Sequence, residues 1–355
     1  MACKQSVQMK QGDGETSYAH NSTIQSKQQN KMKPLIEEAI KSLFGAMDLL
    51  PGRMVIADLG CAFGPNSLAL VSTAVDAVSH HIKMIEQQPL DICVLLNDLP
   101  DNDFNTVAES LSTFKQSYEA LEQIVITTGM VPGSFYKRLF PRGSLHLICS
   151  STSLHWLSEA PEDIVRNRIP LYDSNNNLSK ESSGVILDAY GQQFRKDFTQ
   201  FLRLRAQELV PGGHMILSLY GRRSENQSTH GWQHIVSVLN DMASRGVIDK
   251  QKFDSFYIPM YAPLEKELKT IIEAEGSFEI NKALVHEPIG PTLVPIERAL
   301  TIRAVFEPII LKHFGASEAI MDEFIRTTER HINYRRLEGA RIPLVFLTVS
   351  LRNLF

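Results

Sequence analysis

Two acidic residues lie where the chain turns sharply after an apolar run. Asp58 stands in the segment Ala57–Asn66 (ADLGCAFGPN), between the apolar run Met54–Leu59 and a helical pattern. Glycines in such a turn let the backbone approach a ligand closely, and a carboxylate at its mouth suits a ligand with a cationic amine. An ordinary Asp cap on a strand-to-helix turn explains this segment equally well.

The glycine spacing argues against a nicotinamide dinucleotide as the ligand. The segment lacks the G-x-G-x-x-G pattern, and Asp58 precedes Gly60. In a dinucleotide-binding fold the acidic residue follows the glycines by about 20 residues. An oxidoreductase is therefore the weaker alternative, and it predicts thermal stabilisation by NAD.

Asp98 follows a second apolar run, Asp91–Leu96, within the triplet Asn97-Asp98-Leu99. An acid at this place can accept hydrogen bonds from both hydroxyls of a ribose, although it could also cap the next helix. Asp58 and Asp98 end successive predicted strands. One ligand that joins a nucleoside to an amino acid explains both residues better than two coincident caps.

A third segment, Ser151–Leu157 (STSLHWL), offers N–H donors beside an aromatic ring. His155 and Trp156 could hold a carboxylate in a mostly apolar pocket, although such a pair more often only packs in a core. The polar segment 1–30, by its composition alone, is typical of a frayed leader.

Composition excludes several other classes. The formal net charge of −4 over 355 residues argues against nucleic acid and anionic membrane as partners. The chain shows no HExxH, GxSxG or P-loop motif. It has no apolar run of membrane-spanning length, and its first ten residues are unlike a secretory signal. The four cysteines form no CxxC pair, which favours a reduced, cytoplasmic protein; they are Cys3, Cys61, Cys93 and Cys149.

These residues need a scaffold, and the hydrophobic pattern predicts one. Apolar runs of strand length are Met54–Leu59, Asp91–Leu96, Ile124–Thr128, Leu145–Cys149, His214–Tyr220 and Val345–Leu351. Helical patterns cover Ser67–Val78, Ile186–Leu209, Gly231–Ser244, Leu264–Glu275, Thr301–Phe314 and Ser317–His331. Apolar strands that alternate with helices predict an α/β fold with a mostly parallel sheet and helices on both faces.

The predicted organisation has four parts: an N-terminal segment 1–30, an α/β core 31–221, a mainly helical cap 222–341, and a final core strand in 342–355. A loop around 157–185 joins the cap. Ligands of open α/β sheets bind beyond the carboxyl ends of the strands, so we expect the cap to close over that edge.

Taken together, the segments resemble the plant SABATH family of S-adenosyl-methionine-dependent carboxyl and N-methyltransferases. The resemblance covers nearly the whole chain. Its motifs are MKQGDGETSYAHNSTIQ, IADLGCAFGPNS, LNDLPDNDFN, VPGSFYKRLFP, SSTSLHWLS, FLRLRAQELVPGG and IRAVFEPIILKHFG. It implies a class I methyltransferase fold of the Rossmann-like type, a homodimer, and an N-terminal segment that folds over the ligands rather than a frayed leader.

The resemblance also implies site residues. Those for S-adenosyl-methionine are Tyr18, Ser22, Asp58, Cys61, Asn66, Asp98, Leu99, Ser134 and Phe135. The carboxylate of a small acid would be held by Gln25 and Trp156, with Lys10 nearby. The rest of the substrate pocket would be Thr152, His155, Trp232, Ile302, Val305 and Leu344, of which His155 belongs to the catalytic set with Gln25 and Trp156.

A magnesium site of structural or stimulatory role is also implied, at Asn167, Asp254, Phe256 and Tyr257. Tyr257 departs from the asparagine of many relatives, although the remaining oxygen donors suit a hard cation. Thr152 also departs, since many salicylate-type and caffeine-type members have tyrosine there. A small residue at this place, together with Ile302, is more similar to the jasmonate-methylating branch.

The expected reaction is methyl transfer from S-adenosyl-methionine to the carboxylate of a jasmonate-, salicylate- or benzoate-like acid. A carboxylic acid is ionised at neutral pH, so the reaction needs no general base, in agreement with the lack of a catalytic triad motif. Two alternatives stay open: N-methylation of a purine-like ring, and a silent family member that only binds an acid.

Overall fold

The computed structural model describes residues 8–46, 52–85, 90–120, 124–171, 180–224, 233–287, 294–337 and 344–355. The strands in these ranges are β1 (Arg53–Leu59), β2 (Leu90–Asp98), β3 (Ile124–Pro132), β4 (Leu145–Ser151), β5 (Leu209–Arg222), β6 (Phe278–His286) and β7 (Leu344–Asn353). The helices are α1 (Thr23–Ala46), α2 (Ala69–Ile85), α3 (Phe104–Ser117), α4 (Glu162–Arg166), α5 (Lys180–Glu208), α6 (Gln233–Ser244), α7 (Lys250–Asp254), α8 (Glu265–Glu275), α9 (Pro295–Phe314) and α10 (Glu318–Leu337).

The strands form one seven-stranded sheet in the order β3-β2-β1-β4-β5-β7-β6. The first five strands in this order pair in parallel. β7 is antiparallel to both of its neighbours, β5 and β6. The predicted α/β fold with a mostly parallel sheet is confirmed.

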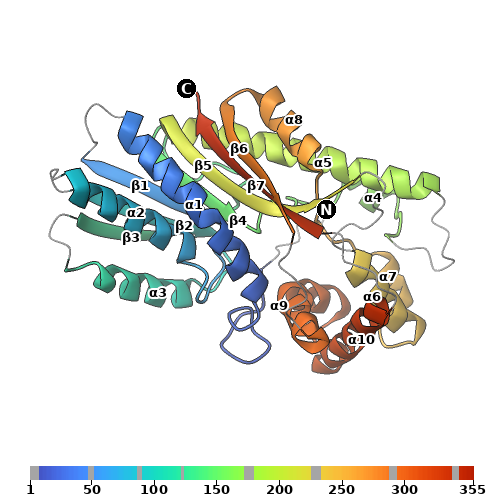
Figure 1. Cartoon of the computed structure of the whole chain (residues 1–355). Coiled ribbons are helices and arrows are strands. Elements are labelled where there is room, and N and C mark those ends of the chain that lie inside the picture. The colour runs from blue at the N-terminus through green and yellow to red at the C-terminus, as the bar shows by residue number, and fades with distance from the viewer. Residues whose placement is uncertain are drawn as a thin grey trace.

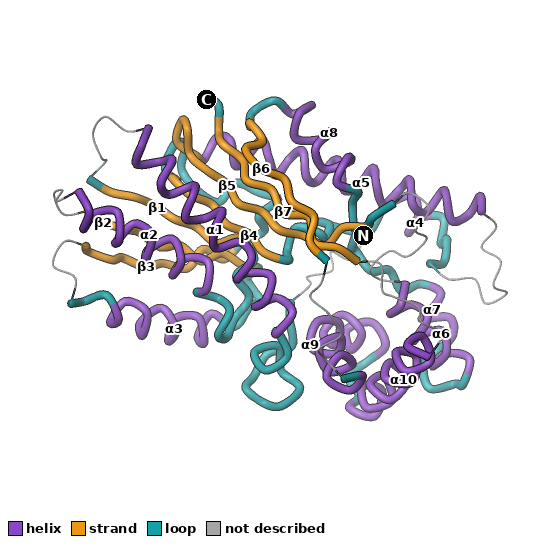
Figure 2. The backbone as a smooth tube through the Cα atoms, in the orientation of Figure 1, coloured by secondary structure: helices purple, strands orange, loops and turns teal. Residues whose placement is uncertain are grey.

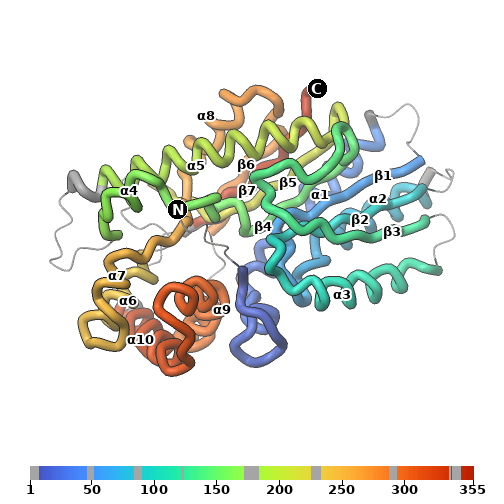
Figure 3. Tube along the Cα trace, turned by 180° about the vertical axis from the view of Figure 1, so that it is seen from behind, coloured from blue at the N-terminus to red at the C-terminus, as the bar shows by residue number. Residues whose placement is uncertain are grey.

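Both faces of the sheet are covered, because alternate residues of its central strands face opposite sides. In β1, Met54 and Ile56 belong to the core on the face of α1, α2 and α3. Val55 and Ala57 belong to the core on the opposite face, which α5 crosses. Figure 1 and the reverse view in Figure 3 show these two helical layers.

A group of helices, α6, α7, α9 and α10, lies apart from these layers, beyond one end of the sheet (Figure 2). The loop before α1 lies beside α9 in both views (Figures 1 and 3), and the backbone N–H of Lys10 donates to the carbonyl of Ala304, 2.8 Å away. These segments are far apart in sequence, and together they enclose the carboxyl ends of the parallel strands.

Several elements differ from the sequence-based expectation, which also left out α3, α4 and α7. β6 was not expected; it pairs with β7 at the edge, and much of it is exposed, so it lacks the apolar run of a buried strand. α1 was not expected either, because Pro34 and many polar residues interrupt its pattern. α9 begins at Pro295, six residues before the predicted start at Thr301. The four-part domain division remains a prediction.

No helix in the described ranges is both long enough and apolar enough to cross a membrane.

Candidate functional site

One large pocket, of about 1020 Å³, lies where the parallel strands end. Its walls come from the N-terminal segment, from the ends of β1, β2, β4 and β5, and from α5, α6 and α9. Most of the predicted site residues line it together: Tyr18, Gln25, Cys61, Asn66, Asp98, Leu99, Ser134, Phe135, Thr152, His155, Trp156, Ile302 and Val305. The volume is at the upper end of the range for ligand pockets, which suits two ligands side by side.

The turn after β1 requires small residues for a geometric reason. Gly60 has a φ of +77°, and a Cβ there would lie 2.3 Å from the hydroxyl oxygen of Ser153. The carbonyl of Asn97, at the end of β2, accepts from the backbone N–H groups of Gly60 and Cys61. The turn is thus fastened to the neighbouring strand, and its backbone faces the pocket without a side chain in between.

The two acidic residues, both predicted to bind the cofactor, differ in their surroundings. Asp98 accepts hydrogen bonds from the backbone N–H groups of Ala62 and Leu99, each 2.7 Å long. Burial raises its pKa to about 6, although these two hydrogen bonds lower it. Both carboxylate oxygens of Asp98 retain a free lone pair for a further donor.

Asp58 lies deeper, directly behind the turn, and is 1% exposed. Its Oδ1 has no hydrogen-bond partner among the described residues. Burial, and then the charge of Asp98, raise the pKa of the Asp58 carboxyl to about 8. Such a carboxyl favours the arrival of a cation, because a positive charge would stabilise its ionised form.

Ser22 does not line the pocket but supports it. The side-chain amide of Asn66 donates to the carbonyl and to the hydroxyl of Ser22, 3.0 and 2.8 Å away. The amide of Gln29 donates to the carbonyl of Asn66. The start of α1 is therefore tied to the loop between β1 and α2.

The loop after β3, with Ser134 and Phe135, is held by a fully buried ion pair on α5. Arg205 donates to the carbonyls of Phe135 and Lys137 and pairs with Glu208 at 2.8 Å. Glu208 in turn accepts from the backbone N–H groups at positions 139 and 140. The hydrogen bonds to each charge offset the free-energy cost of burying this pair.

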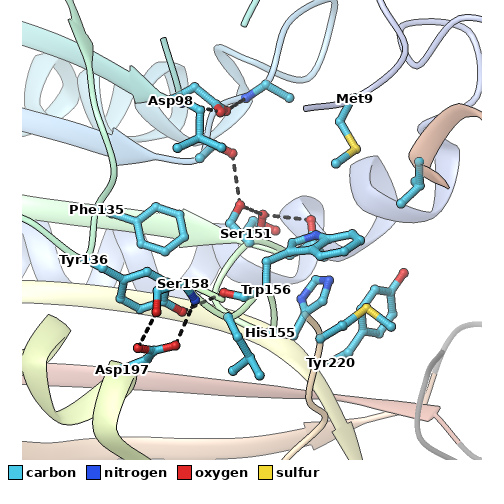
Figure 4. A pocket seen from close by; sticks show the side chains of 18 of the residues that line it. Met9, Asp98, Phe135, Tyr136, Ser151, His155, Trp156, Ser158, Asp197 and Tyr220 are labelled. Carbon is cyan, nitrogen blue, oxygen red and sulfur yellow. Dashed lines mark hydrogen bonds between the residues drawn. The ribbon is translucent and has the colours of Figure 1, made fainter. Parts of the chain in front are cut away.

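Polar groups without protein partners face the other half of the pocket. Gln25 is 6% exposed, and its Oε1 is buried without a partner among the described residues. Nδ1 of His155 likewise has no hydrogen-bond partner among the described residues. Burial lowers the pKa of His155 to about 3, so the ring is neutral. Trp156 adds one N–H donor. Figure 4 shows His155 and Trp156 beside the cavity, with Tyr220 next to them.

The walls around these donors are apolar. Ile302, Val305 and Phe306 line the pocket from α9, and the rings of Trp156 and Phe306 are 5.6 Å apart. Thr152 has a φ of 55° and donates its hydroxyl to the carbonyl of Ser151. A pocket with a few polar groups among apolar walls suits a small acid, whose polar head and apolar body match these two parts.

Lys10 lies elsewhere than predicted for a substrate contact. It does not line the pocket, and its ammonium pairs with Glu307 of α9 at 2.7 Å. Its role as a substrate-binding residue therefore stays a prediction, whereas its contact with α9 anchors the N-terminal segment. Trp232 and the side chain of Leu344 lie outside the described residues.

The four positions expected for magnesium do not fit this ion. Asp254 already pairs with Lys250, 2.8 Å away. Phe256 is buried and has no side-chain oxygen, and Tyr257 is also buried. Asn167 caps α4. In the described ranges, no three His, Cys, Asp or Glu side chains gather into a possible metal site. One paired carboxylate is a poor donor set for a hard dication.

Sequence reasoning missed several residues that line the pocket, among them Tyr136, Tyr220, His234 and Arg298. Tyr136 donates its hydroxyl to the carbonyl of Trp156, 2.7 Å away. Arg298 had a usable signal: it precedes Ile302 by four residues and so shares its helical face. It was missed because the helix was predicted to begin only at position 301.

The arrangement can thus bind an amine-bearing nucleoside next to an acid. Asp98 lines the pocket, with Asp58 buried behind the turn and outside the lining, and Gln25, His155 and Trp156 line it as well. No cysteine–histidine or serine–histidine hydrogen bond of a nucleophilic enzyme occurs among the lining residues that the structure describes.

Comparison with known proteins gives a consistent result. The family model described as SAM-dependent carboxyl methyltransferase matches residues 4–354. The chain is 39% identical to a probable jasmonic acid carboxyl methyltransferase of Theobroma cacao and 40% identical to the salicylate carboxymethyltransferase of Clarkia breweri, and it covers 99% of both chains in each case. It is 38% identical to a probable caffeine synthase of Camellia sinensis, over 91% of each chain. The solved structure of loganic acid methyltransferase with SAH superposes with a TM-score of 0.81 at 28% identity, covering 97% of this chain and 98% of that one.

Proposed function

Because the chain belongs to the family of SAM-dependent carboxyl methyltransferases, we propose that it methylates the carboxylate of a small, largely apolar acid. The methyl group comes from S-adenosyl-methionine, and the products are a methyl ester and S-adenosyl-homocysteine. The class of acid is jasmonate-, salicylate- or benzoate-like.

The cofactor half of the pocket is supported by its two carboxyls. In this proposal Asp58 accepts the cationic amine of S-adenosyl-methionine, since its Oδ1 lacks a partner among the described residues. Asp98 accepts from the ribose hydroxyls, and the adenine lies beside Ser134 and Phe135, whose loop Arg205 holds. Once bound, S-adenosyl-methionine supplies an electrophilic methyl carbon on a sulfonium.

One observation carries the choice of a carboxylate as acceptor. The pocket joins a neutral His155, the indole N–H of Trp156 and the side-chain amide of Gln25, whose Oε1 has no partner among the described residues, to apolar walls from α9. The charged Lys10 is bound by Glu307 instead. Neutral donors can orient an ionised carboxylate without over-stabilising it, which would slow its attack on the methyl carbon.

The reaction then depends on positioning. The substrate carboxylate is already ionised near neutral pH, so no side chain has to remove a proton. Holding one carboxylate oxygen in line with the methyl carbon can lower the barrier by roughly 7–11 kcal/mol. Gln25 and Trp156 perform this orientation, while His155 shapes the pocket around the carboxylate.

Three further features belong to the proposal. The N-terminal segment closes over both ligands, supported by the contacts of Lys10 with α9. The enzyme is a homodimer, as the family resemblance implies. It acts in the cytoplasm, in keeping with the unpaired thiols of Cys61, Cys93 and Cys149. Magnesium enters no step, because the residues expected to hold it do not fit the ion.

The test is methyl transfer from labelled S-adenosyl-methionine to a panel of acids. The panel contains jasmonate, salicylate, benzoate, anthranilate, indole-3-acetate and cinnamate, with xanthines as the matched nitrogen acceptors. We expect a methyl ester from at least one acid and no product from the xanthines.

Each contrary outcome identifies an alternative. Transfer to a xanthine with none to the acids would replace the proposal by N-methylation. Measurable binding of S-adenosyl-methionine without transfer to any acid in the panel or in plant extracts would indicate a silent binding protein.

A further inference from the structure

The acid half of the pocket has a second polar end, which the proposed reaction does not use. There the lining residues are His234 of α6 and Arg298 and Thr301 of α9. Tyr220 connects the two ends: its ring packs edge-on against His155 with centroids 4.7 Å apart. The charge of Arg298 in turn lowers the pKa of Tyr220, against a larger rise from burial, so Arg298 lies close to this ring.

Neither Arg298 nor His234 has a side-chain hydrogen bond or ion pair with any residue that the structure describes. His234 is 8% exposed, and both of its ring nitrogens lack hydrogen-bond partners within the described ranges. Burial is also the main reason why its pKa falls to about 3, so the neutral ring has one donor and one acceptor to offer. Arg298 forms no ion pair with any carboxylate that the structure describes.

Other buried arginines of the chain behave differently. Arg205 pairs with Glu208, Arg222 with Glu267, and Arg303 with Glu307. Burial lowers the pKa of Arg298, and the charge of Arg335 lowers it further, whereas Tyr220 raises it. A half-buried guanidinium without a counter-charge is costly, unless a ligand supplies the missing anion.

The position of Arg298 sets the size of such a ligand. Phe306, which packs against Trp156, follows Arg298 by eight residues on α9. At 1.5 Å per residue this separation is about 12 Å along the helix. Ile302 and Val305 lie between and line the pocket, so the ligand would have an apolar body between two polar ends.

Resting on the proposed function, we propose that the preferred member of this class of acids carries a second carboxylate: one carboxylate faces the methyl group beside Gln25 and Trp156, and Arg298 with His234 binds the second. The guanidinium fork matches a carboxylate with two parallel hydrogen bonds. The product is then a monoester that keeps one free acid. A monoacid with a purely apolar tail would leave Arg298 and His234 without partners. It would therefore bind more weakly, because polar groups that lose water without gaining a partner cost free energy.

Three probes of equal chain length test this inference: nonanedioic acid, nonanoic acid and 9-hydroxynonanoic acid. Their binding is measured by calorimetry on the protein saturated with S-adenosyl-homocysteine, so the readout does not depend on turnover. We expect the diacid to bind about tenfold tighter than either monoacid, which corresponds to about 1.4 kcal/mol.

The variants are Arg298→Met, which removes the charge at similar length, and Arg298→Lys, which keeps it. Arg298→Met should abolish the preference for the diacid and leave nonanoic acid unchanged, while Arg298→Lys should retain part of it. Arg142→Met is the matched control, because Arg142 is exposed and does not line the pocket; it should change nothing.

Equal binding of the three probes, no binding of the diacid, or an equal effect of Arg298→Met on all three would overturn the inference. A preference for the hydroxy acid as strong as that for the diacid would do so too, since it would assign a neutral group to this end. None of these outcomes affects methyl transfer to the acid panel, which tests the proposed function separately.

Discussion

At the scale of single residues, Asp58 and Asp98 show how one side-chain type can serve two purposes. Both are buried at the ends of neighbouring strands. Asp98 has its charge supported by two backbone donors, whereas Asp58 has an oxygen without a partner in the described ranges. The pKa values differ accordingly, at about 6 for Asp98 and about 8 for Asp58. Asp58 is therefore the residue whose ionisation should depend on the cofactor.

The first prediction concerns the pH dependence of cofactor binding. Below pH 8 the Asp58 carboxyl of the ligand-free protein is mostly protonated, and a cationic amine needs the ionised form. Affinity for S-adenosyl-methionine should therefore fall by about tenfold or more from about pH 8 to about pH 6, with proton release on binding. Calorimetry in buffers of different ionisation enthalpy measures both.

The same pKa has a consequence for stability. Because burial raises the folded-state pKa of Asp58 from its ordinary value of 3.8 to about 8, folding favours the protonated form. The free energy of unfolding of the ligand-free protein should thus fall as the pH rises from about 4 to about 8. Asp58→Asn should flatten both profiles; unchanged profiles in this variant would refute the assignment.

The second prediction concerns the donors to the substrate. Gln25→Ala and Trp156→Ala each remove a hydrogen bond that orients the carboxylate, worth about 1.5–3 kcal/mol, so kcat/KM should fall by roughly tenfold to a hundredfold. Cofactor affinity should stay nearly unchanged. Asn30→Ala, at an exposed position on the same helix as Gln25, is the control. Loss of cofactor binding in both variants would contradict the roles given to Gln25 and Trp156.

At the scale of elements, α5 does more than cover the sheet. Its last turn carries Arg205 and Glu208, which together bind four backbone groups of the loop after β3. This loop carries Ser134 and Phe135 into the pocket. The shape of the predicted adenine site thus depends on α5, although no local sequence pattern links this helix to the loop after β3.

The third prediction follows from this buried pair. Arg205→Met leaves Glu208 as an uncompensated buried charge, so the free energy of unfolding should fall by about 3–5 kcal/mol. In folded protein at low temperature, affinity for S-adenosyl-methionine should fall more than affinity for the acid. The double variant Arg205→Met with Glu208→Met should be more stable than the sum of the single effects predicts.

Denaturant unfolding and calorimetry measure these quantities. Arg166→Met, in an exposed ion pair with Glu162, is the matched control and should change stability by less than about 1 kcal/mol. Equal losses of affinity for both ligands in Arg205→Met would show that Arg205 has no specific link to the adenine side.

At the scale of the whole molecule, the pocket exists only because distant parts of the chain meet. The N-terminal segment contacts α9 through the ion pair of Lys10 with Glu307. This segment and α9 both line the pocket at the ends of the parallel strands. Residue Asn167 and the segment 254–257, where magnesium was expected, do not form a suitable metal site. These four positions also lie outside the lining of the pocket in which the two proposed ligands would meet.

The fourth prediction is that metal removal has little effect. Asp254 is already paired with Lys250, and the neighbouring side chains bring too few hard donors for magnesium. Dialysis against a chelator should change kcat and KM by less than about twofold, which is below 0.5 kcal/mol. A loss of activity that magnesium restores, and that Asp254→Asn reproduces, would reverse this conclusion.

The sequence by itself determined the parallel part of the sheet and the edge of the sheet at which the pocket lies. Buried parallel strands need continuous apolar runs, and the ends of such strands meet at one edge. Asp58, Asp98, His155 and Trp156 could therefore be assigned to one site. β6 and α1 could not be predicted: an exposed edge strand needs no apolar run, and packing against the sheet holds α1 together despite Pro34.

Only the tertiary structure decided which polar groups are satisfied. Lys10, Arg205 and Arg298 are all cations near the pocket, and no local pattern distinguishes them. In the fold, Lys10 and Arg205 meet glutamates, whereas Arg298 meets none among the described residues. Pairing of side chains depends on contacts between residues far apart in the chain, so the end of the pocket that selects the substrate becomes visible only once these contacts have formed.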